Sequence, residues 1–177
     1  MKKQSKVIFI CTGNSARSIM GEIAANTLTN NKFIGYSAGS NPTGVINSAA
    51  LSVAEEISYP AEKLTSKNID LFLDDEHHFD LSITVCDNAK DNCPLFLNSS
   101  QSLHWSYPDP AAITDFESRK IKLLEIYYDL GKRLNALCKI NPISHNCHKR
   151  YINSSYNFIK RVHFLFVTST YSVNRKI

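Results

Sequence analysis

The hydrophobic residues nearest the N-terminus form one short continuous run, VIFI, at positions 7–10. β-Branched and aromatic residues in such a run are typical of a buried strand. The run ends at Cys11, and the small, turn-forming residues that follow at 12–15 predict a loop. From Ser18 onward apolar residues recur near one face at helical spacing, so Arg17 is expected where a helix begins. The pattern therefore predicts a strand, a loop and a helix, with a cysteine at the end of the strand.

Further along the chain, strand-like and helix-like patterns alternate. Runs at 33–38 and 80–85 predict two more strands, and the second of these also ends at a cysteine, Cys86. Strands that alternate with helices indicate a three-layer α/β domain (αβα) with a central, mainly parallel sheet. In such sheets a ligand site lies at the carboxyl ends of the strands, where Cys11 and Cys86 both fall. The other expected elements are a helix at 49–57 capped by Asn47 or Ser48, a short helix started by Thr65 or Ser66, a turn-rich loop at 104–111 and a long amphipathic helix at 113–138.

The composition is that of an ordinary globular chain, with 43% hydrophobic and 20% charged residues among 177. We expect one domain at 1–139, and no run is long enough for a membrane span or a signal-peptide core. A basic C-terminal tail at 140–177 holds six of the 20 basic residues and none of the 16 acidic ones. The domain at 1–139 therefore carries 14 basic and 16 acidic residues. The net positive charge therefore belongs to the tail, whose structure and role the sequence does not predict. Five cysteines without a secretion signal favour thiol chemistry in the cytoplasm over structural disulfides.

The loop after the first strand has the composition of an oxyanion site. Consecutive backbone amides that curl into a helix N-terminus form a concave nest for a dianion. Arg17 adds a planar fork that can bind two oxygens at once. The same partial positive charge stabilises a thiolate, so Cys11 is expected to be a nucleophile near neutral pH. A structural cysteine in a chance strand–turn–helix is the alternative, but this spacing of Cys and Arg suits a tetrahedral anion better than it suits packing. We expect the oxyanion to be bound by Thr12, Gly13, Asn14, Ser15, Ala16 and Arg17.

Cys86 and Cys93 are separated by six residues in a polar stretch. A zinc pair is disfavoured, because knuckle spacing is usually about two to four residues and two further ligands would be needed. The adjacent His77 and His78 indicate a solvated loop, so no metal site is predicted. The two cysteines are either unrelated thiols or, if the segment between them loops out, a reversible redox pair.

Asp109 lies between two prolines, Pro108 and Pro110, which hold its backbone stiff. A stiff loop suits a carboxylic acid that must present a proton in a fixed place. An ordinary turn aspartate has the same pattern, and the residues alone favour that interpretation.

The sequence CTGNSARS at 11–18, with its C-x5-R-S spacing directly after a strand, resembles the low-molecular-weight tyrosine phosphatase superfamily. Within it the chain is most similar to the thioredoxin-coupled arsenate reductases, over about residues 5–139. Those enzymes have a C-x6-C pair in the place of 86–93, which simple phosphatases of the superfamily are not expected to carry. Both branches place an acid in a D-P pair at the position of Asp109. Phosphatases often have an aromatic residue after that pair, whereas Ala111 here is like the reductases.

The resemblance implies that arsenate is reduced to arsenite through a relay of three cysteines. The Cys11 thiolate attacks arsenate while Asp109 protonates the departing oxygen. Cys86 then attacks the sulfur of Cys11, which releases arsenite. Cys93 resolves the resulting disulfide to Cys86–Cys93, which thioredoxin reduces. The resemblance also implies that Ser18 hydrogen-bonds the Cys11 sulfur and supports the thiolate.

The resemblance further implies that Asn14 shapes the loop. At one position, which concerns cation binding, this sequence departs from the family pattern. Family members with a potassium site near Asn14, Glu22 and Ser37 have an acidic residue where the resemblance places Lys67. An ammonium group there is expected to take the place of the ion. We therefore predict no bound potassium and no other cofactor.

Two other functions remain open at this point. A phosphatase acting on phosphotyrosine or a small phosphoester would use Cys11, Arg17 and Asp109 through a phosphocysteine. A non-catalytic oxyanion-binding or partner-binding protein needs neither a nucleophile nor an acid. Two relay thiols favour thioredoxin as the reductant of a reductase, with glutaredoxin and glutathione as the alternative. The expected partners are thus an arsenate- or phosphate-like oxyanion and thioredoxin, with no membrane and no nucleic acid, and Cys138 and Cys147 are expected to be buried or incidental thiols.

Overall fold

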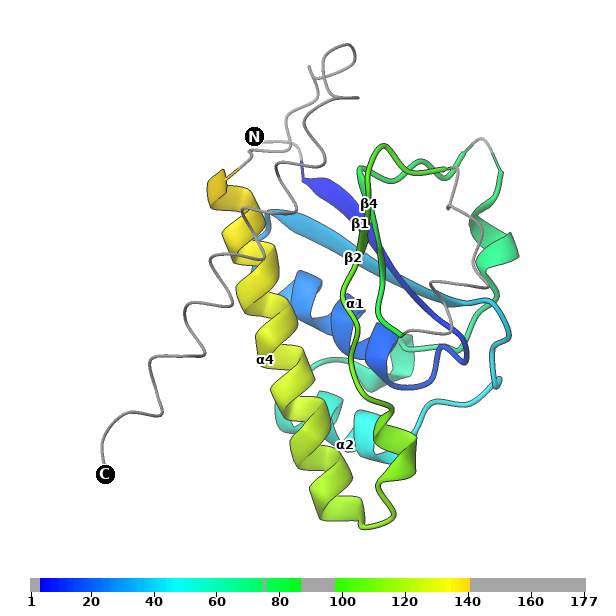
Figure 1. The fold of residues 1–177 in the computed structure, drawn as a ribbon, viewed down its shortest axis with the longest axis vertical. Helices are drawn as coiled ribbons and strands as arrows, with labels where there is room; N and C mark the ends of the chain where they lie inside the picture. The colour runs from blue at the N-terminus through cyan, green and yellow to red at the C-terminus, as the bar shows by residue number, and fades with distance from the viewer. Residues whose placement is uncertain (1–3, 75, 87–97, 141–177) are drawn as a thin grey trace. The chain divides into compact units, whose positions relative to one another are not determined.

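The computed structural model describes residues 4–74, 76–86 and 98–140, and a parallel sheet lies at its centre (Figure 1). The described strands are arranged in the order β2-β1-β3-β4, and each neighbouring pair is parallel. The prediction of a three-layer α/β fold with a mainly parallel sheet is confirmed. The strands are β1 (Ser5–Cys11), β2 (Phe33–Gly39), β3 (Leu81–Thr84) and β4 (Ser102–His104).

The fourth strand is a correction to the sequence-based prediction, which placed a loop from residue 104 and no strand before it. β4 has three residues, and it pairs with β3 from Ser82↔Ser102 to Thr84↔His104. Side chains reinforce the pairing: the hydroxyls of Ser82 and Ser102 lie 2.7 Å apart, and Thr84 Oγ1 lies 2.7 Å from His104 Nδ1. So short a strand has no apolar periodicity, and its position depends on β3 rather than on its own sequence.

Helices α1 (Arg17–Leu28) and α4 (Phe116–Ile140) pack against each other, and α1 covers one face of β1 and β2 (Figure 1). Helix α2 (Ser48–Glu56) packs on α4 and is capped by Asn47, one of the two predicted caps. Helix α4 begins three residues after the predicted start, because Asp115 binds the backbone N–H of Ser118 and so caps the first turn.

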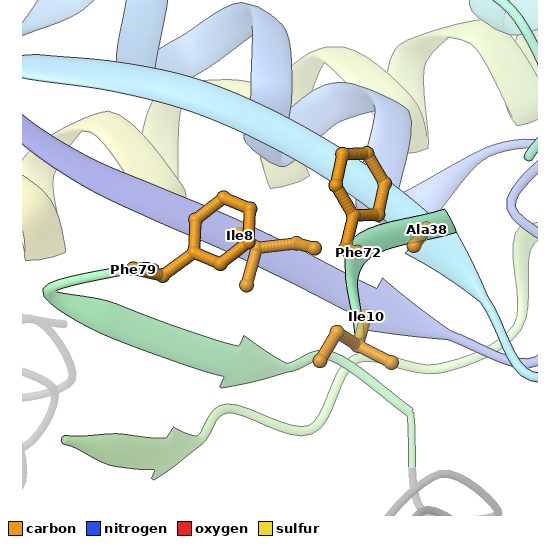
Figure 2. Close-up of a cluster of buried hydrophobic side chains, with 5 residues drawn as sticks. All are labelled: Ile8, Ile10, Ala38, Phe72 and Phe79. Atoms are coloured by element: carbon orange, nitrogen blue, oxygen red, sulfur yellow. The ribbon is translucent and has the colours of Figure 1, made fainter. Parts of the chain in front are cut away.

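The opposite face of the sheet is covered by the segment that joins α2 to β3. Figure 2 shows Phe72 and Phe79 packed on the strands beside Ile8, Ile10 and Ala38, the buried cluster of this face. VIFI is therefore buried on both faces, which explains why it is continuously apolar.

The joining segment contains the 3₁₀ helices η1 (Ala61–Lys63) and η2 (Ile69–Phe72). The predicted start of the short helix was wrong. Asn68, not Thr65 or Ser66, caps η2, with its side-chain oxygen accepting from the N–H of Asp70 at 3.0 Å.

Among the described residues, no helix is both long and apolar enough to cross a membrane. The tail from residue 141 lies outside the described residues, and the assignment of 1–139 as one domain stays a prediction.

Candidate active site

The two strands that end at cysteines are direct neighbours in the sheet. β1 pairs with β2 on one side and with β3 on the other, so the strand order reverses at β1. A crevice forms at such a reversal, beyond the carboxyl ends of the strands. Cys11 ends β1 and Cys86 follows β3 by two residues, and both are buried free thiols. The hydroxyl of Thr12 lies 3.6 Å from the Cys86 sulfur, which places this second thiol against the loop that follows Cys11.

The Cys11 sulfur is held by two hydrogen-bonding groups. The backbone N–H of Asn14 donates to it at 3.2 Å, and the Ser18 hydroxyl lies 3.0 Å away, the contact that the resemblance implied. The Asn14 side chain donates to the Ser18 oxygen at 2.9 Å. Because this bond occupies an acceptor site of Ser18, the Ser18 hydrogen is available to the sulfur. These contacts fix the position of the Cys11 sulfur relative to the loop and to helix α1.

Asn14 ties the loop to a neighbouring segment, and its role in shaping the loop stays a prediction. Its φ angle is +42°, in the left-handed region that asparagine tolerates better than most residues. Its side-chain oxygen accepts from the backbone N–H of Lys67 at 2.7 Å, so the fully buried amide is bonded at both ends. The loop is therefore fixed to the segment before η2.

The carbonyl groups of the loop are bound by neighbouring segments. Ser40, Asn41 and Thr43 donate backbone N–H groups at 2.9–3.2 Å, and the Ser66 hydroxyl adds a bond of 3.2 Å. A peptide N–H points opposite to its carbonyl, so carbonyls turned outward direct the amides inward, toward the space above the sulfur. The acceptors of these bonds are the carbonyls of Cys11, Thr12 and Gly13, and the carbonyl of Ser15 accepts from Asn47 N–H at 2.9 Å.

Arg17 is the first residue of α1, and it brings Asp109 into the site. Its Nη2 lies 3.3 Å from Asp109 Oδ1, and its Nη1 donates to the carbonyl of Tyr107 at 3.1 Å. Asp109 Oδ1 also accepts from Ala111 N–H at 3.2 Å, where it caps the 3₁₀ helix η3 (Pro110–Ala112). The arginine predicted to bind the oxyanion and the predicted proton donor thus lie together, at the start of the helix that follows the Cys11 loop.

A buried carboxylate lies behind the loop. Glu22 Oε2 accepts from the Ser37 hydroxyl at 2.5 Å and forms an ion pair with Lys67 Nζ at 3.5 Å. The ammonium also donates to the Thr65 carbonyl at 3.1 Å. Lys67 thus neutralises Glu22 at the position where the resemblance placed it. In the part of the chain that the structure describes, no three His, Cys, Asp or Glu side chains gather as ligands for a metal ion.

Cys93 and Cys147 fall outside the described residues, so the relay role of Cys93 stays a prediction. Cys138 is half-buried on α4, and burial raises the pKa of its thiol, so it suits the incidental role expected for it. His77 bonds Asp74 at 2.6 Å and His78 bonds Ser100 at 2.9 Å, contacts that fit a polar loop.

Tyr107 was missed by the sequence analysis. Its ring is buried, which raises the pKa of its phenol well above the ordinary value, and its hydroxyl donates to Asp129 at 2.7 Å. The local sequence around Tyr107 gives no signal for these contacts, because the partners of Tyr107 are Arg17 on α1 and Asp129 on α4.

Known proteins resemble this chain in sequence and in fold. The family model described as low molecular weight phosphotyrosine protein phosphatase matches residues 6–139. A protein of Bacillus subtilis named arsenate reductase is 34% identical over 138 residues, 77% of this chain and 97% of the relative. Another of that name, from Halalkalibacterium halodurans, is 32% identical over 134 residues, 75% of this chain and 94% of the relative.

A solved structure described as an arsenate reductase in the phosphate binding state superposes with a TM-score of 0.61 at 26% identity. The match covers 78% of this chain and all of the other.

Proposed function

The chain belongs to the low molecular weight phosphotyrosine protein phosphatase family, and from its place among relatives named arsenate reductases we propose that it is an enzyme that reduces arsenate to arsenite. The proposal includes a relay through Cys11, Cys86 and Cys93 that thioredoxin regenerates. It places the reaction in the cytoplasm, where thioredoxin systems keep thiols reduced.

The observation that carries the proposal is the position of Cys86. A phosphatase of this geometry needs one nucleophilic thiol, whereas a reductase must collect two electrons from thiols near the bound oxyanion. The Cys86 sulfur is buried and lies 3.6 Å from the hydroxyl of Thr12, the residue directly after the nucleophile. A second thiol at the neighbouring strand end supports an attack on Cys11.

In the first step the Cys11 thiolate attacks arsenic(V), and a sulfur–arsenic bond replaces one arsenic–oxygen bond. Asp109 gives its proton to the departing oxygen, which leaves as water. The inward amides and Arg17 stabilise the charge on the remaining oxygens, which is the largest contribution that a fixed site of this kind makes. No electrons are transferred to arsenic in this step.

In the second step the Cys86 thiolate attacks the Cys11 sulfur. A Cys11–Cys86 disulfide forms, the sulfur–arsenic bond breaks, and its electron pair stays on arsenic, which leaves as arsenite at oxidation state +3. Cys93 then attacks Cys86, forms a Cys86–Cys93 disulfide and returns Cys11 as a thiolate. Reduced thioredoxin supplies two electrons and two protons to close the cycle. The role of Cys93 rests on the resemblance and on its spacing.

Phosphoester hydrolysis is the second candidate function. Phosphate and arsenate have nearly the same shape and charge, and Cys11, Arg17 and Asp109 suffice to form and release a phosphocysteine. The Arg17–Asp109 contact of 3.3 Å favours this activity equally, since both reactions need the same first step. The second thiol is what the phosphatase reaction leaves unused.

The test is NADPH consumption by the protein with thioredoxin, thioredoxin reductase and arsenate, beside hydrolysis of para-nitrophenyl phosphate by the same preparation. We expect arsenate-dependent consumption that Cys11→Ser, Cys86→Ser and Cys93→Ser each abolish. Only Cys11→Ser should abolish hydrolysis. Cys138→Ser is the matched control, because it removes a half-buried thiol on α4 that has no part in the relay.

Three outcomes would contradict the proposal or one of its parts. Hydrolysis that needs Cys11 alone, with no arsenate-dependent consumption, would assign the protein to the phosphatases. Normal cycling of Cys93→Ser with thioredoxin would leave reduction in place but refute the relay. Consumption that requires glutathione and glutaredoxin instead would refute the thioredoxin coupling.

A further inference from the structure

The loop that carries Asp109 is tied to helix α4 by side chains that the proposed reaction does not use. The Tyr107 hydroxyl donates to Asp129 Oδ2 at 2.7 Å. Arg133 Nε, one helical turn further along α4, donates to the same oxygen at 2.7 Å. One carboxylate oxygen therefore holds both the loop and a guanidinium of its own helix.

The Arg133 guanidinium also contacts the loop through two aromatic rings. Its central carbon lies 5.6 Å from the ring centroid of Trp105 and 5.6 Å from that of Tyr107. Both distances are within the range of a cation–π interaction. The two aromatic residues are buried, so the rings cannot easily turn away from the guanidinium.

The same loop contacts the anion-binding arginine. The Tyr107 carbonyl accepts from Arg17 Nη1 at 3.1 Å, and Asp109 lies 3.3 Å from Arg17 Nη2. Pro108 between them fixes one backbone angle, so the position of Tyr107 limits where Asp109 can lie. Tyr107 thus connects α4, through its hydroxyl, to Arg17, through its carbonyl.

A simpler interpretation is that Asp129 and Arg133 form an ordinary ion pair four residues apart on a helix. Such pairs contribute little to stability where they are partly exposed, as these side chains are. That interpretation does not account for the Tyr107 hydroxyl on the same oxygen or for the two rings against one guanidinium. All three contacts converge on the loop of Asp109.

We propose that Asp129 and Arg133 are positioning residues that set the place of Arg17 and Asp109 by holding the 105–109 loop against α4. Neither touches the oxyanion. The effect on proton transfer rests on the proposed function, but the effect on anion binding does not, because Arg17 binds a phosphate whether or not the protein reduces arsenate.

The first test measures the binding of inorganic phosphate by calorimetry to the full chain and to the variants Arg133→Met and Tyr107→Phe. The Tyr107→Phe variant keeps the buried ring and the carbonyl and removes only the hydroxyl. We expect each variant to bind phosphate about tenfold more weakly, because a misplacement of about 1 Å can cost about 10²-fold and we expect a smaller shift here. Lys122→Met is the matched control, since it breaks an exposed ion pair with Glu125 on the same helix.

The second test uses Trp105, the single tryptophan of the chain, as a reporter of the loop. We expect phosphate to change its fluorescence in the wild type and in Lys122→Met, and to change it less in Arg133→Met. A purely structural role would lower the unfolding temperature without changing the phosphate affinity of the folded protein. Unchanged affinity in both Arg133→Met and Tyr107→Phe would refute the proposal, even if arsenate reduction were established.

Discussion

The Arg17 guanidinium and the Asp109 carboxylate form an ion pair in the free protein, with Nη2 3.3 Å from Oδ1. The Asp109 side chain is 56% exposed, so solvent screens the pair and its contribution to stability is small. The pair matters for the proposed binding of an oxyanion, because an oxyanion in the loop would compete with Asp109 for the Arg17 guanidinium. We expect anion binding to release the carboxyl group, which can then face the oxygen that must leave.

Asp109→Asn is expected to change binding and turnover in opposite directions. The variant frees Arg17 for the anion, so phosphate should bind more tightly. It also removes the proton donor, so kcat should fall by about 10²–10⁴-fold. Calorimetry and the coupled assay measure the two quantities. Asp115→Asn is the control, since it removes an exposed carboxylate that caps α4, and weaker phosphate binding by Asp109→Asn would contradict the competition.

Asn14→Ala is expected to lower the free energy of unfolding by about 1–3 kcal/mol, because it removes two hydrogen bonds of a buried side chain. Asn30→Ala provides the comparison. Asn30 also has a positive φ, of +50°, but it is exposed, so its replacement tests the backbone angle without the buried network. Urea unfolding measures both, and equal losses in the two variants would mean that the backbone angle, not the network, decides the stability.

Gly39→Ala is expected to weaken phosphate binding, because a Cβ at this position would lie 2.5 Å from the carbonyl oxygen of Thr12 and would push the loop. Gly21→Ala is the matched variant. Its Cβ would collide with the Phe9 ring, between α1 and β1, at an expected cost of about 1–3 kcal/mol in stability. Phosphate affinity should therefore fall for Gly39→Ala alone. An equal fall in both variants would contradict the prediction, because it would mean that any disturbance of the packing weakens phosphate binding.

Lys67→Met is expected to destabilise the protein by about 1–3 kcal/mol, because it leaves the buried Glu22 carboxylate with the Ser37 hydroxyl but without a cation. Lys63→Met, on the exposed side of η1, should have almost no effect. For the wild type we expect the same Tm in potassium and sodium chloride at equal ionic strength. A rise in Tm that is specific to potassium would refute the prediction that the ammonium takes the place of the ion.

Stability is expected to fall at alkaline pH, and Tyr107→Phe should reduce the fall. Burial raises the pKa of Tyr107 above its ordinary value of 10.0, so the folded state keeps the phenol proton after the unfolded state has released it. Below pH 10 both states are protonated and this residue adds no pH dependence. Above pH 10 it should lower the free energy of unfolding by about 1.4 kcal/mol per pH unit. Denaturant titrations at pH 9, 10 and 11 measure the slope, which should be shallower in the variant but not zero, because burial also raises the pKa of Tyr59 and Tyr127.

The parts that local sequence determines were predicted well. The run at 7–10 is apolar on both faces, and the small residues after Cys11 leave few alternatives to a loop that enters a helix. The placement of Cys11 and Cys86 at neighbouring strand ends followed from the rule for parallel sheets, and the structure confirms it. The contact between Ser18 and the Cys11 sulfur followed from the resemblance.

The parts that depend on distant partners were not predicted. β4 forms because its backbone pairs with the edge of β3. Asn68 caps η2, in place of the hydroxyl of Thr65 or Ser66 that the sequence predicted. The bonds of Tyr107 to Arg17 and Asp129 join residues 90 and 22 positions away. No periodicity in a single sequence contains such pairings.

The carbonyl groups of the loop after β1 are bound by other segments of the chain, and this has a consequence for transplanting the loop into another protein. The octapeptide CTGNSARS holds its shape through bonds from 40–47 and from Ser66 and Lys67, which lie outside it. Placed alone between a strand and a helix of another protein, it would lack those donors, and its amides would have no fixed direction. To transplant the proposed oxyanion site, a designer would therefore have to carry three separate segments together, namely 11–18, 40–47 and 66–67.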